Sequence, residues 1–349
     1  MRVLVAMSGG VDSSVAAARM VAEGHDVTGV TLKLWAGPDG EMPTAGCCTV
    51  ADSEDARRVA AQLDIPYYVL DYTEDFSRGV IDGFVSGYLS GRTPNPCVEC
   101  NRTVKFSRLL EQAAEFGCET VVTGHYARVD RHGGRYRLRR GVDSAKDQSY
   151  VLSMLGQDQL ARVRFPVGHL EKHQVRRIAA DLGLRTARKP ESMDICFVGR
   201  RDYRAFLRDE APDALEPGAV MTTDGRQVGT HEGVAGFTVG QRRGLGVALG
   251  EPHFVVGVDA PNRTVTIGTR EHLATRSIAL DHIAWTDRPL EGGQQVLIQY
   301  RAHGDATGAL WDGVARATFL HPQVAVAPGQ TAAFYRGDEV LGGGIIVSA

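Results

Sequence analysis

The chain has 349 residues, of which 43% are hydrophobic and 23% charged, and its formal net charge is −3. This length predicts two or three domains, and the composition is that of an ordinary globular protein. The sequence has no apolar run of the roughly 18 residues that a membrane span needs. The first residues, MRVLVAMSGG, end in a glycine turn and not in a cleavage site, so we expect a cytoplasmic protein with no membrane partner.

Basic residues are concentrated in one segment. Residues 128–190 contain 15 Lys and Arg against 6 Asp and Glu, whereas the rest of the chain carries a net charge of −12. A basic segment in an otherwise acidic protein is typical of a surface that binds a polyanion. It is equally typical of solvated faces of helices and hairpins, so both interpretations stay open.

Short apolar runs alternate with helical patterns over about the first 200 residues. Buried strands are predicted at RVLVAM (2–7), HDVTGVTLKLW (25–35), YYVLD (67–71) and ETVVTG (119–124). Helices are predicted at SSVAAARMVAEG (13–24) with Gly24 as C-terminal cap, at DSEDARRVAAQLD (52–64) behind an Asp or Ser cap, and at KFSRLLEQAAEFG (105–117). This alternation predicts the α/β class, with a parallel sheet that has helices on both faces.

The pattern changes after about residue 204. Short strand-like runs, such as PGAVMTTDGRQVGTHEGV (217–234) and HFVVGVDAPNRTVTIGT (253–269), are separated by Gly, Asp-Gly and Pro-Asn turns. We therefore predict one or two small β-barrel-like domains in this part of the chain.

MSGGVDSSV (7–15) connects the first predicted strand to the first predicted helix. Gly9 and Gly10 allow a tight turn that brings N–H groups close to an anion, and the helix adds its positive end. Ligands of parallel sheets bind at this edge, so we expect the loop to hold phosphate groups. It has no Lys, unlike a Walker A loop, and does not match G-x-G-x-x-G. Asp12 within it either helps to hold Mg²⁺ or only caps the helix.

This loop resembles the SGGxDS pyrophosphate loop of the ATP-pyrophosphatase superfamily, whose members adenylate an oxygen atom and release pyrophosphate. Five further stretches narrow the resemblance: TPNPCVECNRTVKF (93–106), TGHYAR (123–128), AKDQSYVL (145–152), ICFVG (195–199) and GFTVGQRRGLGV (236–247). In this order they resemble the bacterial tRNA-specific 2-thiouridylases, the MnmA family. The resemblance covers essentially the whole chain.

The resemblance implies an α/β nucleotide-binding domain of the ATP-pyrophosphatase type (1–203), a small central β domain (204–275) and a C-terminal β-barrel domain (276–349). It implies an enzyme, a tRNA-uridine 2-sulfurtransferase. Such an enzyme adenylates the C2 oxygen of the wobble uridine, transfers sulfur to C2 and releases AMP and pyrophosphate. Its cofactors would be ATP and Mg²⁺. Its partners would be tRNA and a sulfur-donor protein, either a cysteine desulfurase or a sulfur relay.

Three cysteines are the catalytic candidates that the resemblance implies. Cys196 would carry a persulfide and Cys100 would be its partner thiol, while Cys97 stands where one branch of the family has Asp. These three thiols could also ligate a 4Fe–4S cluster and leave one iron open, so the persulfide and cluster routes both remain open. Zinc is not favoured, because the C-x-x-C pair has no second ligand pair. The other cysteines, which we expect to be structural, are Cys47, Cys48 and Cys118.

The resemblance also implies contacts with ATP and tRNA. The residues expected at ATP are Ala6, Met7, Ser8, Gly9, Gly10, Val11, Asp12, Ser13, Leu32 and Gly124. Those expected at the target base or elsewhere on tRNA are Asn95, Pro96, Cys97, His125, Lys146, Asp147, Gln148, Gln299, Tyr300 and Gln330. Gln299 replaces an Arg common in the family, and His125 is alternatively a hydrogen-bonded core histidine.

Two other functions stay open. Another ATP-pyrophosphatase, a ligase or amidotransferase that adenylates a small molecule, would share the loop but would not need the cysteines. A non-catalytic protein whose thiols sense redox state would bind tRNA without turnover. Thiouridine formation with AMP release distinguishes the three functions.

Overall fold

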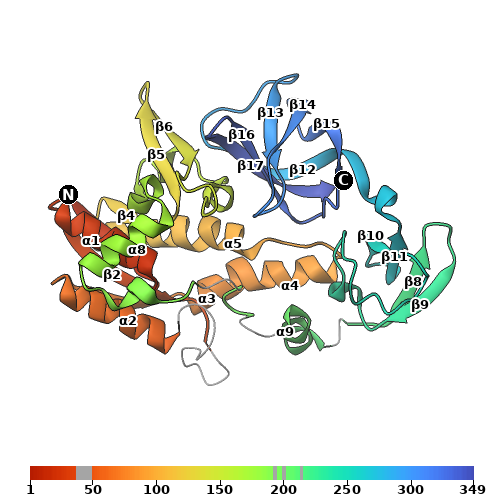
Figure 1. Cartoon of the computed structure of the whole chain (residues 1–349), viewed down its shortest axis with the longest axis horizontal. Helices are drawn as coiled ribbons and strands as arrows, with labels where there is room; N and C mark the ends of the chain where they lie inside the picture. The colour runs from red at the N-terminus through yellow and green to blue at the C-terminus, as the bar shows by residue number, and fades with distance from the viewer. Residues whose placement is uncertain (37–48, 192–194, 199–201, 213–214) are drawn as a thin grey trace.

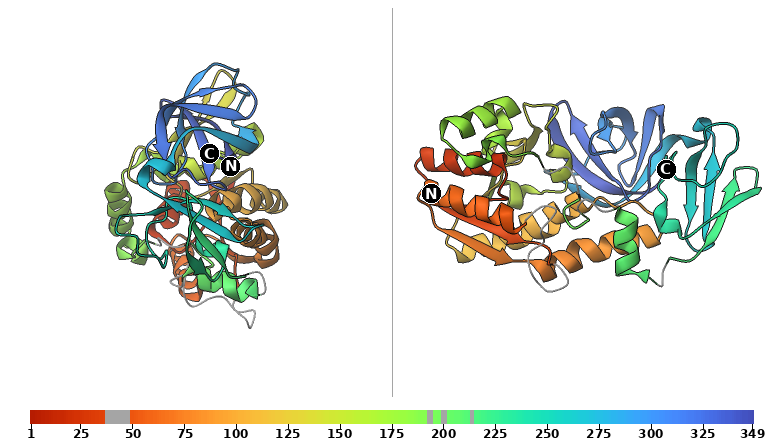
Figure 2. Two further views of the ribbon diagram at one scale, coloured as in Figure 1. Left: turned by 90° about the vertical axis from the view of Figure 1, so that its right-hand side faces the viewer. Right: turned by 60° about the horizontal axis from the view of Figure 1, so that its bottom comes forward.

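A computed structural model describes residues 1–36, 49–191, 195–198, 202–212 and 215–349. An α/β unit comes first, a small β unit follows, and a closed β-barrel ends the chain (Figure 1), which confirms the predicted fold class. The small β unit lies at the opposite end of the molecule from the N-terminus (Figure 2). Within the described ranges no helix is long and apolar enough to cross a membrane.

The described residues of the first unit form a parallel sheet with the strand order β3-β2-β1-β4-β7. Its strands are β1 Arg2–Ala6, β2 Asp26–Lys33, β3 Tyr67–Asp71, β4 Thr120–Val122 and β7 Val163–Arg164. Val3, Leu4 and Val5 in the central strand are fully buried. A strand that is covered on both faces has a continuous apolar sequence, which is why this strand could be predicted.

Helices cover both faces of this sheet. Val3 and Val5 pack with one set of helices, and Leu4, whose side chain points the other way, packs with the second set. The first set is α1 Val11–Ala22, α2 Val50–Gln62 and α8 Lys172–Asp181. The second set includes η1 Ser77–Ile81, α4 Asp82–Leu89, η2 Cys100–Arg108 and α6 Leu109–Glu115.

Two helix ends test the predicted caps. Gly24 follows α1 in a left-handed conformation with φ of 77°, as a C-terminal glycine does. The expected Asp or Ser cap of α2 was wrong, because Thr49 caps it. The Thr49 hydroxyl accepts a hydrogen bond from the Asp52 N–H at 3.1 Å, and the Asp52 carboxylate accepts one from the Thr49 N–H at 3.0 Å.

The helix predicted at 105–117 begins earlier in the chain, and part of it is a π-helix instead of an α-helix. α5 Pro96–Glu99 leads directly into η2, which has the i→i+5 spacing of a π-helix, and then into α6. Asn95 begins this run, because its side-chain oxygen accepts the N–H groups of Cys97 at 3.1 Å and Val98 at 3.3 Å. The remaining helices of the described part of the unit are α3 Thr73–Phe76, η3 Ser149–Leu152, α7 Gln157–Leu160, η4 Pro166–His169 and η5 Arg185–Arg188, and α9 Tyr203–Glu210 leads into the small β unit.

The small β unit is a twisted sheet with the order β10-β11-β8-β9. Its strands are β8 Gly218–Thr222, β9 Gln227–His231, β10 Phe254–Asp259 and β11 Thr264–Gly268, with short helices η7 Val234–Gly236 and η8 Arg270–Leu273 beside them. Its core contains Val220, Val255, Val265 and Ile267, all fully buried. Val265 and Ile267 lie two residues apart in β11, so both side chains point to the same face of the sheet.

The C-terminal barrel closes on itself because its first and last strands, β12 and β17, pair with each other. The strand order is β12-β15-β14-β13-β16-β17. The bounds are β12 Ala274–Trp285, β13 Gln295–Gln299, β14 Thr307–Trp311, β15 Arg316–Val324, β16 Thr331–Arg336 and β17 Glu339–Ser348. Closure removes the free sheet edges, and Trp311 and Phe334 fill the interior.

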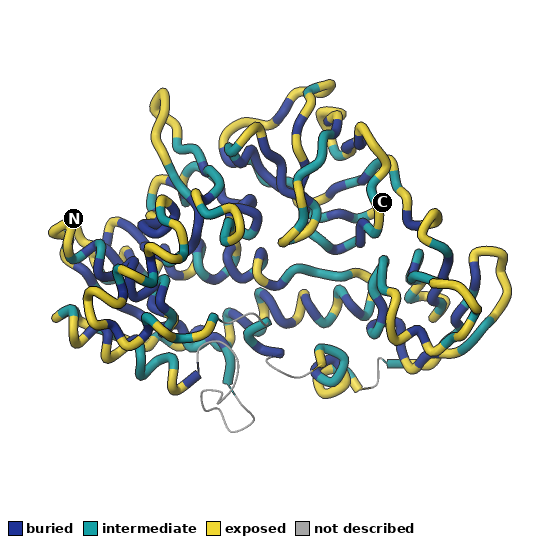
Figure 3. Tube along the Cα trace, in the orientation of Figure 1, coloured by how far each residue is buried: buried dark blue, intermediate teal, exposed yellow. Residues whose placement is uncertain are grey.

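A hairpin of the α/β unit extends the barrel sheet. β5 Ala127–His132 and β6 Arg135–Arg140 form the hairpin, and Leu138 and Arg139 of β6 pair with Val340 and Glu339 of β17. The first and third units are thus joined by backbone hydrogen bonds. The far tip of the hairpin is exposed, whereas buried positions gather in the parallel sheet and the barrel (Figure 3).

Candidate active site

A cavity of about 390 Å³ opens at the carboxyl edge of the parallel sheet. Its wall is formed by the loop after β1, the ends of β2 and β4, the helical run from Pro96, and residues 189–191 and 195–197. Nine of the ten residues expected at ATP line it: Ala6, Met7, Ser8, Gly10, Val11, Asp12, Ser13, Leu32 and Gly124. The cavity therefore joins the predicted phosphate loop to chain segments that lie far away in sequence.

The phosphate loop is held by its own serines. The Ser8 N–H donates to the Ser13 hydroxyl at 3.1 Å, and the Ser14 hydroxyl donates to the carbonyl oxygen of Gly10 at 2.8 Å. Gly10 is the N-cap of α1 and supplies no side-chain cap. The first N–H groups of this helix lie beside the cavity, at the positively polarised end of the helix. An anion bound there would be stabilised.

Two glycines allow this loop to pack closely. Gly9 has φ of 69°, and a Cβ atom there would lie 2.1 Å from the carbonyl oxygen of Asp52. A Cβ atom on Gly124 would lie 2.7 Å from the backbone of both Asp12 and Ser13. Any side chain at either position would push the loop away from its neighbours.

The negative charge of the Asp12 carboxylate is compensated by a neighbouring lysine. The ammonium group of Lys172 lies 2.8 Å from each of its carboxylate oxygens, and the Tyr126 hydroxyl donates to it at 2.7 Å. Burial, together with the Asp12 charge, raises the pKa of Tyr126, so the phenol stays a donor. The interpretation of Asp12 as a helix cap was wrong, since its carboxylate is directed to these two side chains and Gly10 is the cap.

Four of the five lysines of the chain line the cavity: Lys105, Lys146, Lys172 and Lys189. Lys189 binds the carbonyl oxygen of Gly9 at 3.0 Å and the carboxylates of Asp52 and Asp55 at 2.7 Å each. The Glu191 carboxylate forms ion pairs with the ammonium group of Lys146 at 2.6 Å and with that of Lys172 at 3.1 Å. The hydrogen bond from Lys146 holds the pKa of the Glu191 carboxyl below its usual value. The end of the cavity where phosphates would bind is thus lined by lysines together with the carboxylates that pair with them.

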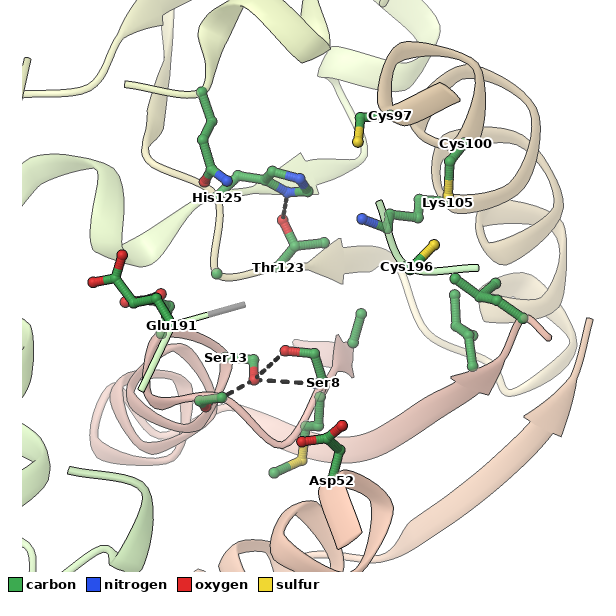
Figure 4. A pocket seen from close by; sticks show the side chains of 18 of the residues that line it. Ser8, Ser13, Asp52, Cys97, Cys100, Lys105, Thr123, His125, Glu191 and Cys196 are labelled. Carbon is green, nitrogen blue, oxygen red and sulfur yellow. Dashed lines mark hydrogen bonds between the residues drawn. The ribbon is translucent and has the colours of Figure 1, made fainter. Parts of the chain in front are cut away.

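The three candidate thiols line the same cavity. Cys97 is exposed, Cys196 is half-buried and Cys100 is buried. Figure 4 shows the three sulfur atoms on one side of the cavity and Ser8 and Ser13 of the phosphate loop on the other. Cys196 lies almost a hundred residues after Cys97 and Cys100, so the fold brings these side chains together.

Metal sites are not preformed in the described part of the chain. There, no group of three or more His, Cys, Asp or Glu side chains is placed to hold a metal ion. Among the described residues the three thiols do not form a site for a single metal ion, and the Asp12 carboxylate is bound by Lys172. Cys118 is buried as expected, while Cys47 and Cys48 lie outside the described residues.

Comparison with known proteins supplies the family. Family models match in succession: the tRNA methyl transferase HUP domain at residues 1–200, the tRNA methyl transferase PRC-barrel domain at 204–269 and the aminomethyltransferase beta-barrel domain at 275–346. A protein of Roseiflexus sp. (strain RS-1), named tRNA-specific 2-thiouridylase MnmA, is 48% identical to this chain, and the alignment covers 99% of both chains. The chain belongs to the MnmA family.

Other MnmA relatives are similar to a comparable extent. The protein of that name from Moorella thermoacetica is 47% identical over 99% of both chains. The one from Geobacter metallireducens is 46% identical over 100% of this chain and 97% of its own length. A solved 4-thiouridine synthetase–RNA complex with bound ATP is only 16% identical, with a TM-score of 0.37 over 61% of this chain and 51% of that chain, and it carries no weight here.

The residues that the MnmA resemblance places at tRNA fall into two groups. Pro96, Cys97, His125, Lys146 and Gln148 line the cavity. The residues that do not line it are Asn95, Asp147, Gln299, Tyr300 and Gln330. The Asp147 carboxylate binds Arg140 at 2.7 Å and the Ser149 hydroxyl at 2.9 Å, and only 6% of that side chain is exposed.

The side chains of three of these residues form hydrogen bonds within the protein: Gln299, Tyr300 and Gln330. Gln299 is buried and accepts a hydrogen bond from Arg140 at 3.0 Å, and the Tyr300 hydroxyl donates to Gln323 at 3.1 Å. Gln330 donates to the carbonyl oxygen of Thr93 at 2.6 Å, which links the barrel to the segment that precedes Asn95 and Cys97. Their contacts with tRNA stay predictions for this MnmA-family chain.

His125 has features of both interpretations. It lines the cavity, yet it is buried and its Nδ1 shares a hydrogen bond of 2.6 Å with the Thr123 hydroxyl. Burial first, and then the charge of Lys105, lower the pKa of the imidazole well below its ordinary value. His125 is therefore neutral, and it can act as a donor or acceptor but not as a cation.

The basic segment has two kinds of arginine. Five of the six hairpin arginines pair with carboxylates, mostly of the barrel: Arg128 and Arg139 with Asp338, Arg135 with Asp287, Arg137 with Glu339 and Arg140 with Asp147. The exposed set around α8 and η5 contains Arg177, Arg185 and Arg188. Part of the basic excess therefore forms ion pairs between the units. Neither interpretation of the sequence included this role.

The sequence interpretation missed Lys105, Tyr126, Lys172, Lys189 and Glu191 as members of the site. The rarity of lysine was the available signal, since 34 of the 39 basic residues are Arg and four of the five Lys lie in one cavity. Tyr126 and Glu191 are identified only by their contacts with Asp12 and with the lysines.

Proposed function

We propose that this protein uses ATP to replace the C2 oxygen of the wobble uridine of tRNA by sulfur. The observation that supports this most directly is the shared cavity, in which a phosphate loop faces three thiols. A cavity that combines these features can activate an oxygen atom and then deliver a sulfur atom to the same carbon. The names of the relatives agree with this chemistry.

The first step makes the uridine oxygen a leaving group. The C2 oxygen attacks the α-phosphorus of ATP, the bond to the bridging oxygen breaks, and pyrophosphate leaves. Lys172, Lys189 and the N-terminal end of α1 lie where they would neutralise the phosphate charge. The loop lacks the lysine with which a P-loop promotes cleavage between the β and γ phosphates. AMP and not ADP is therefore the expected nucleotide product.

The second step transfers sulfur. A persulfide on Cys196, supplied by a sulfur-donor protein, attacks C2 through its outer sulfur, and AMP leaves. The Cys100 thiolate then attacks the Cys196 sulfur, the S–S bond to the base breaks, and 2-thiouridine is released. A disulfide between Cys100 and Cys196 remains, and a dithiol reductant must reduce it before the next turnover.

Metal-dependent variants of this proposal would use the same residues. The described residues form no preformed site for a single metal ion, and no step is routed through Mg²⁺ or a cluster. Mg²⁺ would accompany the phosphates of ATP and screen their charge. A cluster held by Cys97, Cys100 and Cys196 would supply sulfide in place of the persulfide.

The other candidate functions use less of the site. A ligase that adenylates a small molecule leaves the three thiols without a task, and so does the methyl transfer named in the family models. A redox sensor leaves the phosphate loop without a task. The deciding experiment incubates oxygen-free protein with ATP, unmodified tRNA, a cysteine desulfurase with cysteine as the persulfide source and a dithiol reductant, and measures thiouridine and AMP together. Equal amounts of both support the proposal, whereas AMP formed without tRNA-bound sulfur would support a ligase.

A further inference from the structure

One loop of the C-terminal barrel contacts the segment that leads into the helical run with Cys97 and Cys100. This barrel loop, residues 328–331, leads into β16. The Gly329 N–H donates to the carbonyl oxygen of Ile346 at 2.7 Å, and the Ile346 N–H donates to the carbonyl oxygen of Gln330 at 2.8 Å. The loop is therefore fixed to the last strand of the barrel, β17, and moves with it.

The barrel loop holds Thr93 on both sides of its backbone. The Thr93 N–H donates to the carbonyl oxygen of Pro328 at 2.7 Å, and its carbonyl oxygen accepts a hydrogen bond from the Gln330 side chain at 2.6 Å. Gly329, between these two loop residues, has φ of 91°, and a Cβ atom there would lie 2.7 Å from the Thr93 nitrogen. Glycine thus allows the two backbones to approach each other.

A second connection reaches the helical run from the other side of the C-x-x-C pair. The Tyr150 side chain is 1% exposed, and its hydroxyl donates to the carbonyl oxygen of Thr331 at 2.8 Å. The carbonyl oxygen of the next residue, Val151, accepts a hydrogen bond from the Asn101 side chain at 3.2 Å. Asn101 directly follows Cys100, so the barrel loop is connected to the chain both before and after the two cysteines.

The segment between Thr93 and Cys97 is stiff. Thr93 and Asn95 each precede a proline, and such residues are restricted to extended conformations. Asn95 accordingly has φ of −104° and ψ of 98°, and the two prolines fix their own φ angles. A displacement of Thr93 is therefore passed on to Asn95, which caps α5, and to Cys97 in the first turn.

We propose that Gln330 is a positioning residue, which holds Thr93 and thereby sets where Cys97 and Cys100 lie relative to the phosphate loop. This inference rests on the proposed function, in which the activated base and the sulfur must meet in one cavity. The role differs from the tRNA contact that the family resemblance implies for Gln330, because the side-chain amide donates within the protein. Loss of this hydrogen bond should slow thiouridine formation without weakening tRNA binding.

The first test measures hydrogen–deuterium exchange of the full-length protein without ATP or tRNA. Gln330→Met removes the amide at similar length, and Tyr150→Phe removes the hydroxyl that binds Thr331. Gln295→Met, at an exposed glutamine of β13, is the matched control. The first two variants should each speed exchange of the amides of residues 97–104 by roughly threefold to tenfold, which is the net effect of one hydrogen bond on a local opening. Gln295→Met should exchange like the wild type.

The second test separates positioning from a contact with tRNA. In Gln330→Met the kcat of thiouridine formation should fall by roughly threefold to tenfold, while the KM for tRNA should stay within about twofold of the wild-type value. A raised KM with unchanged kcat would overturn the inference, because it would assign Gln330 to tRNA binding. Unchanged amide exchange in Gln330→Met, or an equal change in Gln295→Met, would also overturn it. Faster exchange in Gln330→Met, combined with a wild type that makes no thiouridine, would contradict the proposed function alone.

Discussion

The ammonium nitrogen of Lys172 lies 2.8 Å from both carboxylate oxygens of Asp12, so the acidic residue of the phosphate loop has a counter-ion at the first position of α8. An uncompensated carboxylate in this loop would repel the phosphates of ATP. The pair explains how the loop can contain an Asp and still bind an anion.

This ion pair gives a first prediction. Asp12→Asn and Lys172→Met should each lower the rate of tRNA-dependent pyrophosphate release by roughly tenfold or more, because each leaves one partner without its charge complement. The double variant should lose less than the two single losses combined, since residues in contact are coupled. Strict additivity of the three rates would show that Asp12 and Lys172 act independently.

The two mechanistic thiols should be separable from tRNA binding. Cys196→Ser and Cys100→Ser should each reduce thiouridine formation on the order of a thousandfold or more, because a hydroxyl forms no persulfide and is a poor anion near neutral pH. Affinity for tRNA, measured by filter binding, should stay close to that of the wild type. Cys118→Ser, on a buried thiol outside the cavity lining, is the matched control for thiolation. Retained thiolation in either cavity variant would remove that thiol from the mechanism.

Cys97 distinguishes the persulfide route from the cluster route. On the persulfide route, protein purified without oxygen should thiolate tRNA at full rate in the absence of iron. Cys97→Asp, which restores the Asp of the other family branch, should keep this activity. Iron-loaded wild type beside an iron-poor and inactive Cys97→Asp would instead support the cluster, because oxygen is a harder ligand than the thiolates that clusters favour.

The arginine pairs change where tRNA binding is expected. Arg177→Ala, Arg185→Ala and Arg188→Ala should each weaken binding and reduce the slope of log affinity against log salt by about one where the residue contacts a phosphate. Arg226→Ala, an exposed arginine of the small β unit, is the control. Arg139→Ala should act mainly on stability, because Arg139 pairs with Asp130 and Asp338. A salt slope unchanged in all three variants would exclude α8 and η5 as the tRNA surface.

Two buried histidines connect stability to pH. Burial lowers the pKa of His125 and of His231 below the ordinary value of 6.5. Unfolding exposes them, so the unfolded state binds more protons as the pH falls through about 6.5, and the folded state loses stability below that value. Each contributes up to about 1.4 kcal/mol per pH unit. Thermal midpoints measured from pH 7.5 to 5.5 should fall, and His125→Asn should flatten the curve; an unchanged curve in that variant would assign the effect to other groups.

Local patterns predicted the parallel sheet and the phosphate loop because their signals lie within a few residues of one another. RVLVA followed by a glycine turn and a helical pattern is sufficient for both. The pairing of the hairpin at 127–140 with the barrel could not be predicted, because its partner strand lies about 200 residues later and the Arg128–Asp338 pair spans 210 positions. Pairings of that separation leave no mark on local periodicity.

The site was predicted less completely than the fold. The three thiols came from the family resemblance, and the structure places them in one cavity. The π-type turn was missed because the apolar spacing of 105–117 also suits an α-helix. Asp147 and Gln299 look like surface residues in sequence, but Arg140 binds both of them and little of either side chain reaches solvent. Polar residues whose partners are distant cannot be located from composition.

The most direct measurement of the central claim is a single turnover with labelled sulfur. Cys196 is loaded with a ³⁵S persulfide by a sulfur donor, the donor is removed, and ATP and tRNA are added without reductant. The account predicts one labelled 2-thiouridine per AMP, together with a disulfide between Cys100 and Cys196 detected by peptide mass spectrometry. Labelled tRNA with both thiols still unlinked, or ADP as the nucleotide product, would contradict it.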